Sequence, residues 1–317
     1  MPRHSSAPPK ERRSVDLGSR LLIGMSYLVA QLPFSVQYRL GRWLGRLSRR
    51  IVRSRAKIVD MNLRLCFPEL SEEEREELAI RTFESVGVMW FEVASLAFGR
   101  ADEIVNRGRV WGGDELQQAV DEGNGIILIG VHLNSMEAAA AIMHRNGFEF
   151  SCITRSQKNQ VIDEYFKRHR RARFGSENIF DLKQFNNAIR YLGRKKTNMW
   201  LASDQDMGLR RGTTVMAPFF GVEASTVASP IRVATLWKEE NRPALVLMSQ
   251  HRDEKEQRVH VKFKRIKDLP LEDVCQAAAQ LNGYIEDAIR EHPEQWFWVH
   301  KRFKTLSDGK RRDYNAS

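Results

Sequence analysis

The sequence lacks several features that would assign its chemistry at once. Its 317 residues include three cysteines, Cys66, Cys152 and Cys275, scattered and never in a C-x-x-C pair. Disulfides and structural zinc are therefore not expected. The chain also has no H-E-x-x-H zinc motif and no G-x-S-x-G nucleophile elbow. We therefore expect no metal, no cofactor and no acyl-enzyme intermediate formed on an elbow nucleophile.

Long hydrophobic runs are also missing. The longest apolar stretch, residues 21–34 (LLIGMSYLVAQLPF), ends soon after a proline, whereas a membrane-spanning helix needs about 20 apolar residues. A shallow or tilted anchor is the prediction. The polar, basic residues 1–20 before it predict a disordered arm rather than a cleavable signal.

Acidic residues are too few to balance the basic ones. The 51 Lys and Arg against 40 Asp and Glu give a formal net charge of +11 and a pI near 9.7. Such a chain favours polyanionic partners, among them nucleic acid, an anionic membrane or an acidic carrier protein. No RRM, OB or zinc-finger signature accompanies the charge, so nucleic acid is not expected as a partner.

Residues 38–57 combine an apolar stripe with an arginine-rich one. Leucines, a tryptophan and an isoleucine recur there at helical spacing between arginines, with no acid. A basic amphipathic helix beside an apolar stub is typical of a protein that binds anionic membrane lipids. The alternative is a solvated helix that packs on the domain through its leucine face.

From residue 125 onwards, short β-prone runs alternate with helical segments. This order indicates a mostly parallel central sheet with helices on both faces. Ser71 and Glu74 form a capping box that predicts a helix from about residue 72. The predicted strands are 126–131, 149–154, 198–203, 245–249 and an exposed edge strand 258–266; the predicted helices are 160–172, 183–194, 226–238 and 271–292.

These patterns divide the chain into four parts. They are a disordered basic arm (1–20), an apolar membrane anchor with a basic amphipathic helix (21–57), the catalytic domain (58–306) and a polar tail (307–317).

His132 is the leading candidate for catalysis. It follows the apolar run 126–131, and ligand sites in parallel sheets gather beyond the carboxyl ends of strands. If Asn134 or Ser135 caps a helix there, Glu137 lies in its first turn and can face the imidazole. Such a carboxylate would fix the tautomer and leave the other ring nitrogen as a base for a hydroxyl that attacks an acyl carbonyl. The alternative is a structural histidine.

Other polar residues follow neighbouring strand ends and predict substrate-binding positions. Arg155 comes after the second run, and Asp204 and Asp206 follow the run 198–203. The arginines of KRHRRARFG, Arg170 and Arg173 among them, could bind phosphates through bidentate contacts. The two aspartates are expected either to pair with Arg155 and Arg170 or simply to form a turn.

Taken together, these residues resemble the late (secondary) acyltransferases of lipid A biosynthesis, closest to the lauroyltransferase type. The resemblance rests on YLVAQLPF, RAKIVDMNLRLCFPELSEEER, FESVG, GIILIGVHLNSME, SDQDMG and PEQWFWVHKRFKT, in the family's order. It implies a glycerolipid acyltransferase-like fold at the inner membrane, with the catalytic domain on the cytoplasmic side. In that family the histidine and acid that match His132 and Glu137 form the catalytic pair, and an arginine near 170–173 and the acid matching Asp204 are also functional.

The resemblance further implies the two substrates. An acyl chain would pass from acyl carrier protein to a hydroxyl of a 3-hydroxyacyl chain on a Kdo-bearing lipid A precursor. Two alternatives stay open: a lysophospholipid or glycerolipid acyltransferase using the same pair, and a non-enzymatic protein that binds anionic membranes.

Overall fold

The computed structural model describes residues 10–99, 101–154, 159, 163, 165, 170 and 179–315, with the backbone alone for residues 10–16. The helices are α1 (Lys10–Ala30), α2 (Phe34–Ile51), α3 (Arg53–Cys66), α4 (Glu72–Ala97), α5 (Ala101–Arg107), α6 (Gly113–Asp121), α7 (Met136–Arg145), α9 (Phe185–Lys195), α10 (Ser229–Ala234) and α11 (Val274–Glu291). The strands are β1 (Arg109–Trp111), β2 (Ile126–Gly130), β3 (Ser151–Thr154), β4 (Ile179–Asp181), β5 (Asn198–Ala202), β6 (Thr214–Phe219), β7 (Val222–Val227), β8 (Ala244–Asp253) and β9 (Arg258–Ile266).

The central sheet is mostly parallel, as predicted. In the described part of the chain it has seven strands in the order β1-β9-β8-β2-β5-β3-β4, and β8 and β9 form its antiparallel pair. Strands β6 and β7 form a separate antiparallel hairpin. Strand β2 lies between β8 and β5, so both of its edges are hydrogen-bonded within the sheet.

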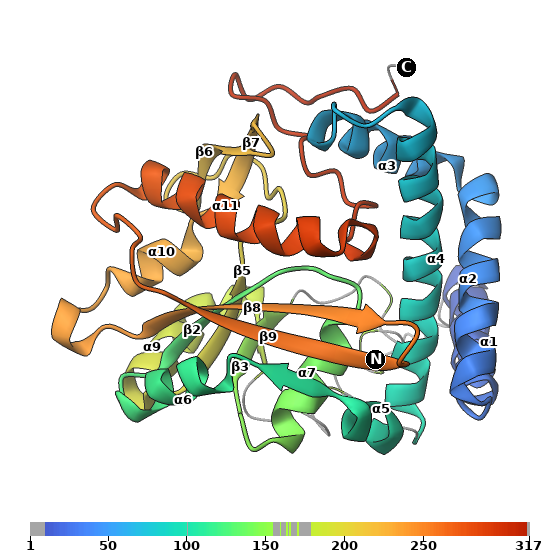
Figure 1. Ribbon diagram of the computed structural model, residues 1–317, viewed down its shortest axis with the longest axis horizontal. Coiled ribbons are helices and arrows are strands. Elements are labelled where there is room, and N and C mark those ends of the chain that lie inside the picture. Colours follow the sequence, from blue (N-terminus) through green and yellow to red (C-terminus); the bar gives the residue numbers. More distant parts are fainter. Residues whose placement is uncertain are drawn as a thin grey trace, which may run out of the picture.

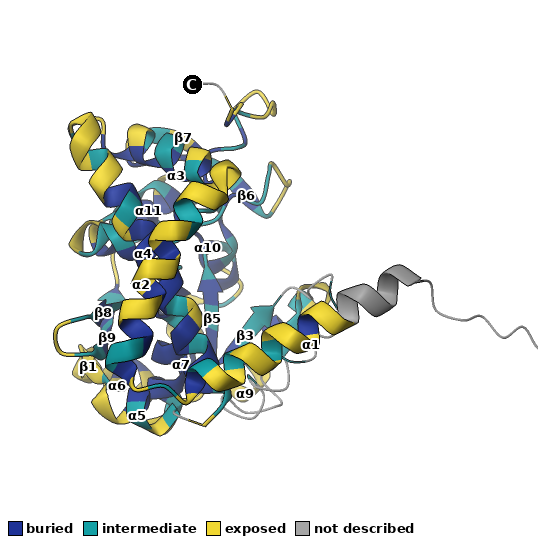
Figure 2. Cartoon of the chain, turned by 90° about the vertical axis from the view of Figure 1, so that its right-hand side faces the viewer, coloured by how far each residue is buried: buried dark blue, intermediate teal, exposed yellow. Residues whose placement is uncertain are grey.

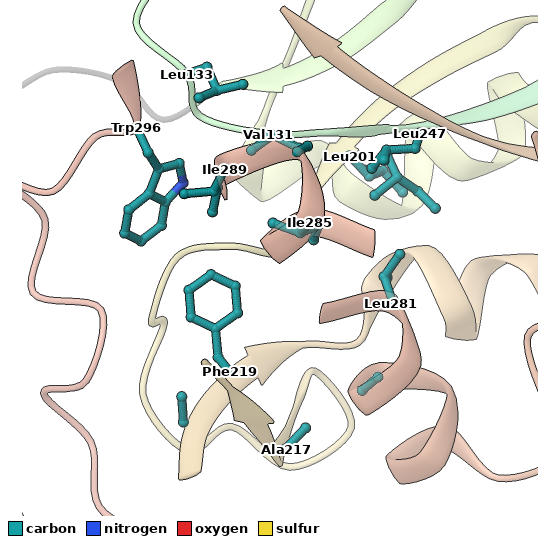
Figure 3. Packing of buried hydrophobic residues seen from close by; sticks show 14 of the residues in the cluster. Val131, Leu133, Leu201, Ala217, Phe219, Leu247, Leu281, Ile285, Ile289 and Trp296 are labelled. Carbon is teal, nitrogen blue, oxygen red and sulfur yellow. The ribbon is translucent and has the colours of Figure 1, made fainter. Parts of the chain in front are cut away.

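Helices cover both faces of this sheet (Figure 1). Side chains of β2 alternate between two hydrophobic clusters, because successive residues of a strand point to opposite faces. Ile127 and Ile129 belong to the cluster that includes α11, and Ile126 and Leu128 to the one that includes α7. Figure 3 shows the first cluster, in which Phe219 and Trp296 lie beside α11. Because β2 is buried on both faces, its carboxyl end is held firmly in place.

Several predicted elements have different limits or neighbours in the structure. The run 258–266 is β9, but it is not the edge strand, since the three-residue β1 pairs with its outer side. The helix expected over 226–238 is shortened to α10, because the preceding residues pair with β6 in the hairpin. The capping box at Ser71 is confirmed, and α4 then continues to Ala97. Most of the predicted helix 160–172 lies outside the described residues.

The N-terminal helices lie along one side of the domain. Helix α1 begins at Lys10, within the segment expected to be a disordered arm, and its side chains are largely exposed from residue 17 onwards (Figure 2). Within the ranges described above, no helix is both long and apolar enough to cross a bilayer.

Helix α2 packs against α4 through its small residues. A β-carbon added at Gly45 would lie 2.1 Å from the backbone oxygen of Phe83, and one added at Gly87 of α4 would lie 2.0 Å from that of Gly41. The backbones of the two helices therefore approach as closely as glycine allows.

Phe34 and Tyr38 at the start of α2 are buried in the core, but the leucines, the tryptophan and the isoleucine that follow point away from this contact. The exposed fraction of Trp43 is 60% and that of Ile51 is 69%, and Leu40, Leu44 and Leu47 are also exposed. The alternative that α2 packs on the domain through its leucine face is therefore wrong. Three arginines of α2 instead bind acids of α3 and α4: Arg42 and Arg46 pair with Glu84, and Arg49 with Asp60 and Glu76.

The glycine contact gives a prediction about stability. Gly45→Ala should lower the free energy of unfolding by roughly 1 to 3 kcal/mol, because the added methyl overpacks a contact with rigid backbone. Gly283→Ala is the matched control, since nothing lies within 4 Å of a β-carbon at this position in α11. It should raise stability by about 0.5 to 1 kcal/mol through helix propensity. Urea unfolding measures both, and equal effects would contradict the packing described here.

Candidate active site

The sheet register places His132 beside Asp204. Strands β2 and β5 run parallel, with Gly130 opposite Ala202, and each of the two side chains lies two residues beyond its strand. Because paired parallel strands advance together, the histidine and the aspartate leave the sheet at the same level.

Three hydrogen bonds hold the Asp204 carboxylate. Its Oδ1 lies 2.6 Å from Nδ1 of His132, and its Oδ2 accepts from the His132 backbone N–H at 2.7 Å and from the Trp296 indole N–H at 2.8 Å. The side chain of Asp204 is fully buried. Burial alone would raise the pKa of Asp204, but the charge of His132 and these hydrogen bonds outweigh it and lower the pKa to about 2.

This contact determines the state of the imidazole. An ionised carboxylate only accepts hydrogen bonds, so Nδ1 of His132 must carry a proton. In the neutral ring Nε2 then has the free lone pair and can accept a proton from a substrate. About a fifth of the His132 side chain is exposed, so the ring is accessible while Asp204 is not. The arrangement can act as a general base that is oriented by a buried acid.

Glu137 has a different partner from the one expected. It lies in the first turn of α7, as predicted, but its carboxylate binds the guanidinium of Arg170, with Nε 3.1 Å from Oε1. The nearby charge of Glu137 raises the pKa of Arg170. The tautomer-fixing contact that we expected from Glu137 is made by Asp204, because the sheet brings Asp204 directly against Nδ1. A catalytic role for Glu137 itself stays a prediction.

The remaining candidate residues separate into two groups. Arg155 and Arg173 lie outside the described residues. Asp206 does not pair with Arg170, as one alternative expected: its carboxylate accepts hydrogen bonds from the backbone N–H and hydroxyl of Thr305 and from the backbone N–H of Gly208. Asp206 therefore joins its own turn to the C-terminal segment.

A buried polar network positions the loop that carries His132. The side-chain amide of Gln250 on β8 donates to the backbone oxygens of Val131 and Leu133. The backbone N–H of Phe297 donates to the backbone oxygen of His132. Asn134 donates to Ser85 on α4. The loop is thus held from the sheet, from the C-terminal segment and from α4.

The centre of this network is a buried ion pair between α4 and the sheet. Arg252 of β8 binds Glu92 of α4 with N–O distances of 2.6 and 2.7 Å, and Ser135 donates to the same carboxylate at 3.3 Å. The pair is almost fully buried, and the charges of both partners are satisfied by each other. No local pattern in the sequence predicts it, since its members are far apart along the chain.

Two cavities meet at His132. One, of about 210 Å³, is mainly apolar and also contains Glu137 and Arg170 in its wall. Its apolar lining is Met136, Ala140, Phe150, Ile153, Trp200 and Met248. The other, of about 520 Å³, has both apolar residues, such as Leu182 and Phe185, and the basic residues Arg210 and Lys304 in its wall, together with His300. Trp200 borders both, and its ring meets that of His132 edge-on at 5.6 Å.

One group of residues outside the cavities has the composition of a metal site. Ligand atoms of Asp253, Glu256 and His260, around the β8–β9 turn, lie within 4.8 Å of one another. Asp253 accepts backbone N–H groups of its own turn, and the Trp111 indole donates to Nδ1 of His260. The carboxylate of Asp253 and Nδ1 of His260, which a metal ion would need as ligands, therefore already accept hydrogen bonds within the protein.

Comparison with known proteins identifies similar chains. The family model described as bacterial lipid A biosynthesis acyltransferase matches residues 10–305. The chain is 34% identical over 292 residues to the lipid A biosynthesis lauroyltransferase of Escherichia coli (strain K12), covering 90% of this chain and 91% of the relative. It is 32% identical, with the same coverage, to the lipid A biosynthesis palmitoleoyltransferase of that strain. It is 28% identical over 284 residues to a lipid A biosynthesis acyltransferase of Haemophilus influenzae, and the match covers 88% of each chain.

The lowered pKa of Asp204 predicts a pH-dependent contribution to stability. The pKa of Asp204 in the folded protein, about 2, lies below the ordinary value of 3.8. The ionised carboxylate therefore stabilises the folded protein above pH 3.8, and this stabilisation is lost as the pH falls towards 2. The contribution is about 2 kcal/mol. The difference in unfolding free energy between wild type and Asp204→Asn should therefore shrink by that amount from pH 5 to pH 2. Asp114→Asn, on the surface of α6, controls for the loss of one charge. A difference that stays constant with pH would contradict the interpretation.

Proposed function

Because the chain belongs to the bacterial lipid A biosynthesis acyltransferases, and is therefore an acyltransferase of that pathway, we propose a specific donor and acceptor for it. The donor is an acyl thioester of acyl carrier protein. The acceptor is a hydroxyl of a 3-hydroxyacyl chain on a Kdo-bearing lipid A precursor. The observation that carries this proposal is a histidine that is oriented by a buried aspartate and lines an apolar cavity.

In the proposed reaction His132 is the general base. Its Nε2 takes the proton of the acceptor hydroxyl as the oxygen attacks the thioester carbon. The new C–O bond forms, the C–S bond breaks, and the imidazolium returns its proton to the leaving thiolate. Asp204 keeps Nδ1 protonated and stabilises the positive charge that develops on the ring. No covalent intermediate with the protein is needed.

The apolar cavity supports a place for the fatty chain. Its lining of methionine, alanine, aromatic and isoleucine side chains begins directly beside His132. A thioester carbon at the histidine could therefore extend its chain into this cavity, where apolar surface is removed from water.

Glu137 and Arg170 occupy the polar part of the same wall. We propose that Glu137 holds the Arg170 guanidinium towards the reacting centre, where it meets the negative charge that develops on the thioester oxygen. In this scheme Glu137 remains a residue of the catalytic site, although it does not touch Nδ1. Arg155 and Arg173 are proposed to bind substrate with Arg170.

The exposed apolar stripe of α2 supports a membrane surface as the working place of the enzyme. We propose that residues 21–57 face anionic lipids of the inner membrane, with the catalytic domain on the cytoplasmic side. Arg39, Arg50 and Arg53 are exposed near the stripe, and among the described residues they make no ion pair. They are therefore available for lipid headgroups.

The mechanism predicts a selective loss of activity. His132→Ala should reduce transfer from acyl carrier protein thioester to the lipid A precursor by at least roughly 10²- to 10⁴-fold, because the base is removed. His144→Ala, on α7 but outside both cavities, should retain activity. Product formation followed by mass spectrometry, with circular dichroism as a check of folding, tests both. Undiminished transfer by the first variant would eliminate His132 as the base.

The membrane proposal predicts which arginines matter. Arg39→Gln, Arg50→Gln and Arg53→Gln combined should weaken binding to vesicles containing anionic lipid, by about 1 kcal/mol for each charge. The matched control replaces Arg190, Arg194 and Lys195 of α9. Vesicle sedimentation measures both. Equal loss in the two triple variants would indicate attraction by net charge alone.

A further inference from the structure

The larger of the two cavities contains charged residues that the base mechanism does not use, Arg210 and Lys304 among them. It shares His132, Ile153, Thr154 and Trp200 with the apolar cavity but extends in another direction, over the loop after β5 and the C-terminal segment. A substrate whose reacting carbon lies at His132 can thus place its fatty chain in one cavity and a polar group in the other. The charged residues of the larger cavity indicate which polar group fits.

Arg210 and Lys304 give this cavity a positive wall. Asp206 also lines it, but its carboxylate is occupied by Thr305 and by the backbone N–H of Gly208. The Lys304 ammonium lies 3.7 Å from Oδ1 of Asp206 and donates to the backbone oxygen of that residue at 2.6 Å, which leaves further N–H donors. The guanidinium of Arg210 has neither an ion-pair nor a hydrogen-bond partner among the described residues.

The backbone that carries Arg210 is held in place. Its N–H donates to the Thr214 hydroxyl at 2.8 Å, and that hydroxyl donates to the backbone oxygen of Gly208 at 2.9 Å. The Ser225 hydroxyl of β7 donates to the same oxygen. The β6–β7 hairpin therefore fixes the loop, although the guanidinium itself is left without an acceptor in the described part of the chain. The Arg210 side chain itself is exposed to solvent.

His300 lines the same cavity as a neutral ring. Its Nε2 accepts the backbone N–H of Asp206 at 3.2 Å, so the neutral ring carries its proton on Nδ1. Burial, with a smaller effect of the Lys304 charge, lowers the pKa of His300 to about 4, and the ring is neutral near pH 7. The wall thus offers two cations beside a neutral imidazole, and the two cations suit a phosphate ester.

We propose that this cavity is a phosphate-binding subsite, in which Arg210 and Lys304 bind a phosphate group of a substrate whose reacting end lies at His132. The inference rests on the proposed function, because that function supplies two substrates with phosphate. The donor carries one in its phosphopantetheine arm, and the glycolipid acceptor carries phosphates on its sugars. The subsite would position the polar part of one substrate while the fatty chain occupies the apolar cavity.

Transfer kinetics with matched substrates test the proposal and identify the source. The variants are Arg210→Gln and Lys304→Gln, with Arg211→Gln and Lys310→Gln as controls outside the cavity. The donors are acyl-phosphopantetheine and acyl-pantetheine, and the acceptors are the precursor with and without its phosphates. Each cavity variant should lower kcat/KM roughly 10- to 100-fold with the phosphate-bearing form of one substrate. It should have little effect with the form that lacks phosphate.

The pattern of losses decides between the sources. A loss that disappears with acyl-pantetheine assigns the subsite to the donor, and one that disappears with the dephosphorylated acceptor assigns it to the glycolipid. Arg210→Lys, which keeps the charge, should recover part of the activity. Losses of equal size with and without phosphate, or cavity variants that behave like Arg211→Gln, would overturn the proposal.

A binding measurement separates this inference from the proposed function. Inorganic phosphate should raise the melting temperature of wild type and of Arg211→Gln more than chloride at equal ionic strength does, and should not do so for the double variant Arg210→Gln/Lys304→Gln. If phosphate stabilises the wild type in this way but no acyl transfer occurs, the function is wrong and the subsite stands. If transfer occurs and phosphate has no selective effect on stability or kinetics, the subsite is wrong.

Discussion

The hydrogen bond between His132 and Asp204 is the interaction on which the site depends. It exists because two parallel strands in the middle of the sheet end at the same level, each with a polar residue two positions further on. A carboxylate without a partner would be costly in so buried a position, so Asp204 is stable there only with the imidazole and the Trp296 indole beside it. The same contact leaves one ring nitrogen of His132 for chemistry.

The surroundings of this pair connect the catalytic loop to the N-terminal helices. The buried Arg252–Glu92 ion pair ties α4 to the sheet, and hydrogen bonds from Ser135 to Glu92 and from Asn134 to Ser85 tie the loop to α4. Helix α2, with its exposed apolar stripe, packs directly on α4 through glycine. The helices proposed to face lipid and the loop that carries the base therefore form one continuous packed unit.

The sequence predicted the sheet and the position of His132, because apolar β-prone runs and strand ends leave local signals. It failed on the partner of His132, which we expected to be Glu137, five residues away. The actual partner depends on strand order: β5 lies between β2 and β3, and no local pattern specifies that insertion. The packed face of α2 was missed for a related reason, since Gly41 and Gly45 have no hydrophobic signal, although close backbone contact requires them.

The tautomer of His132 tests this account most directly. In protein with ¹⁵N-labelled histidine, comparison of wild type with a His132 variant assigns its imidazole signals, and nitrogen NMR then reports which ring nitrogen carries the proton. We expect a protonated Nδ1 and an unprotonated Nε2 in the neutral ring, with the Nδ1 signal altered in Asp204→Asn. A neutral ring with its proton on Nε2 would contradict both the orienting role of Asp204 and the use of His132 as the base.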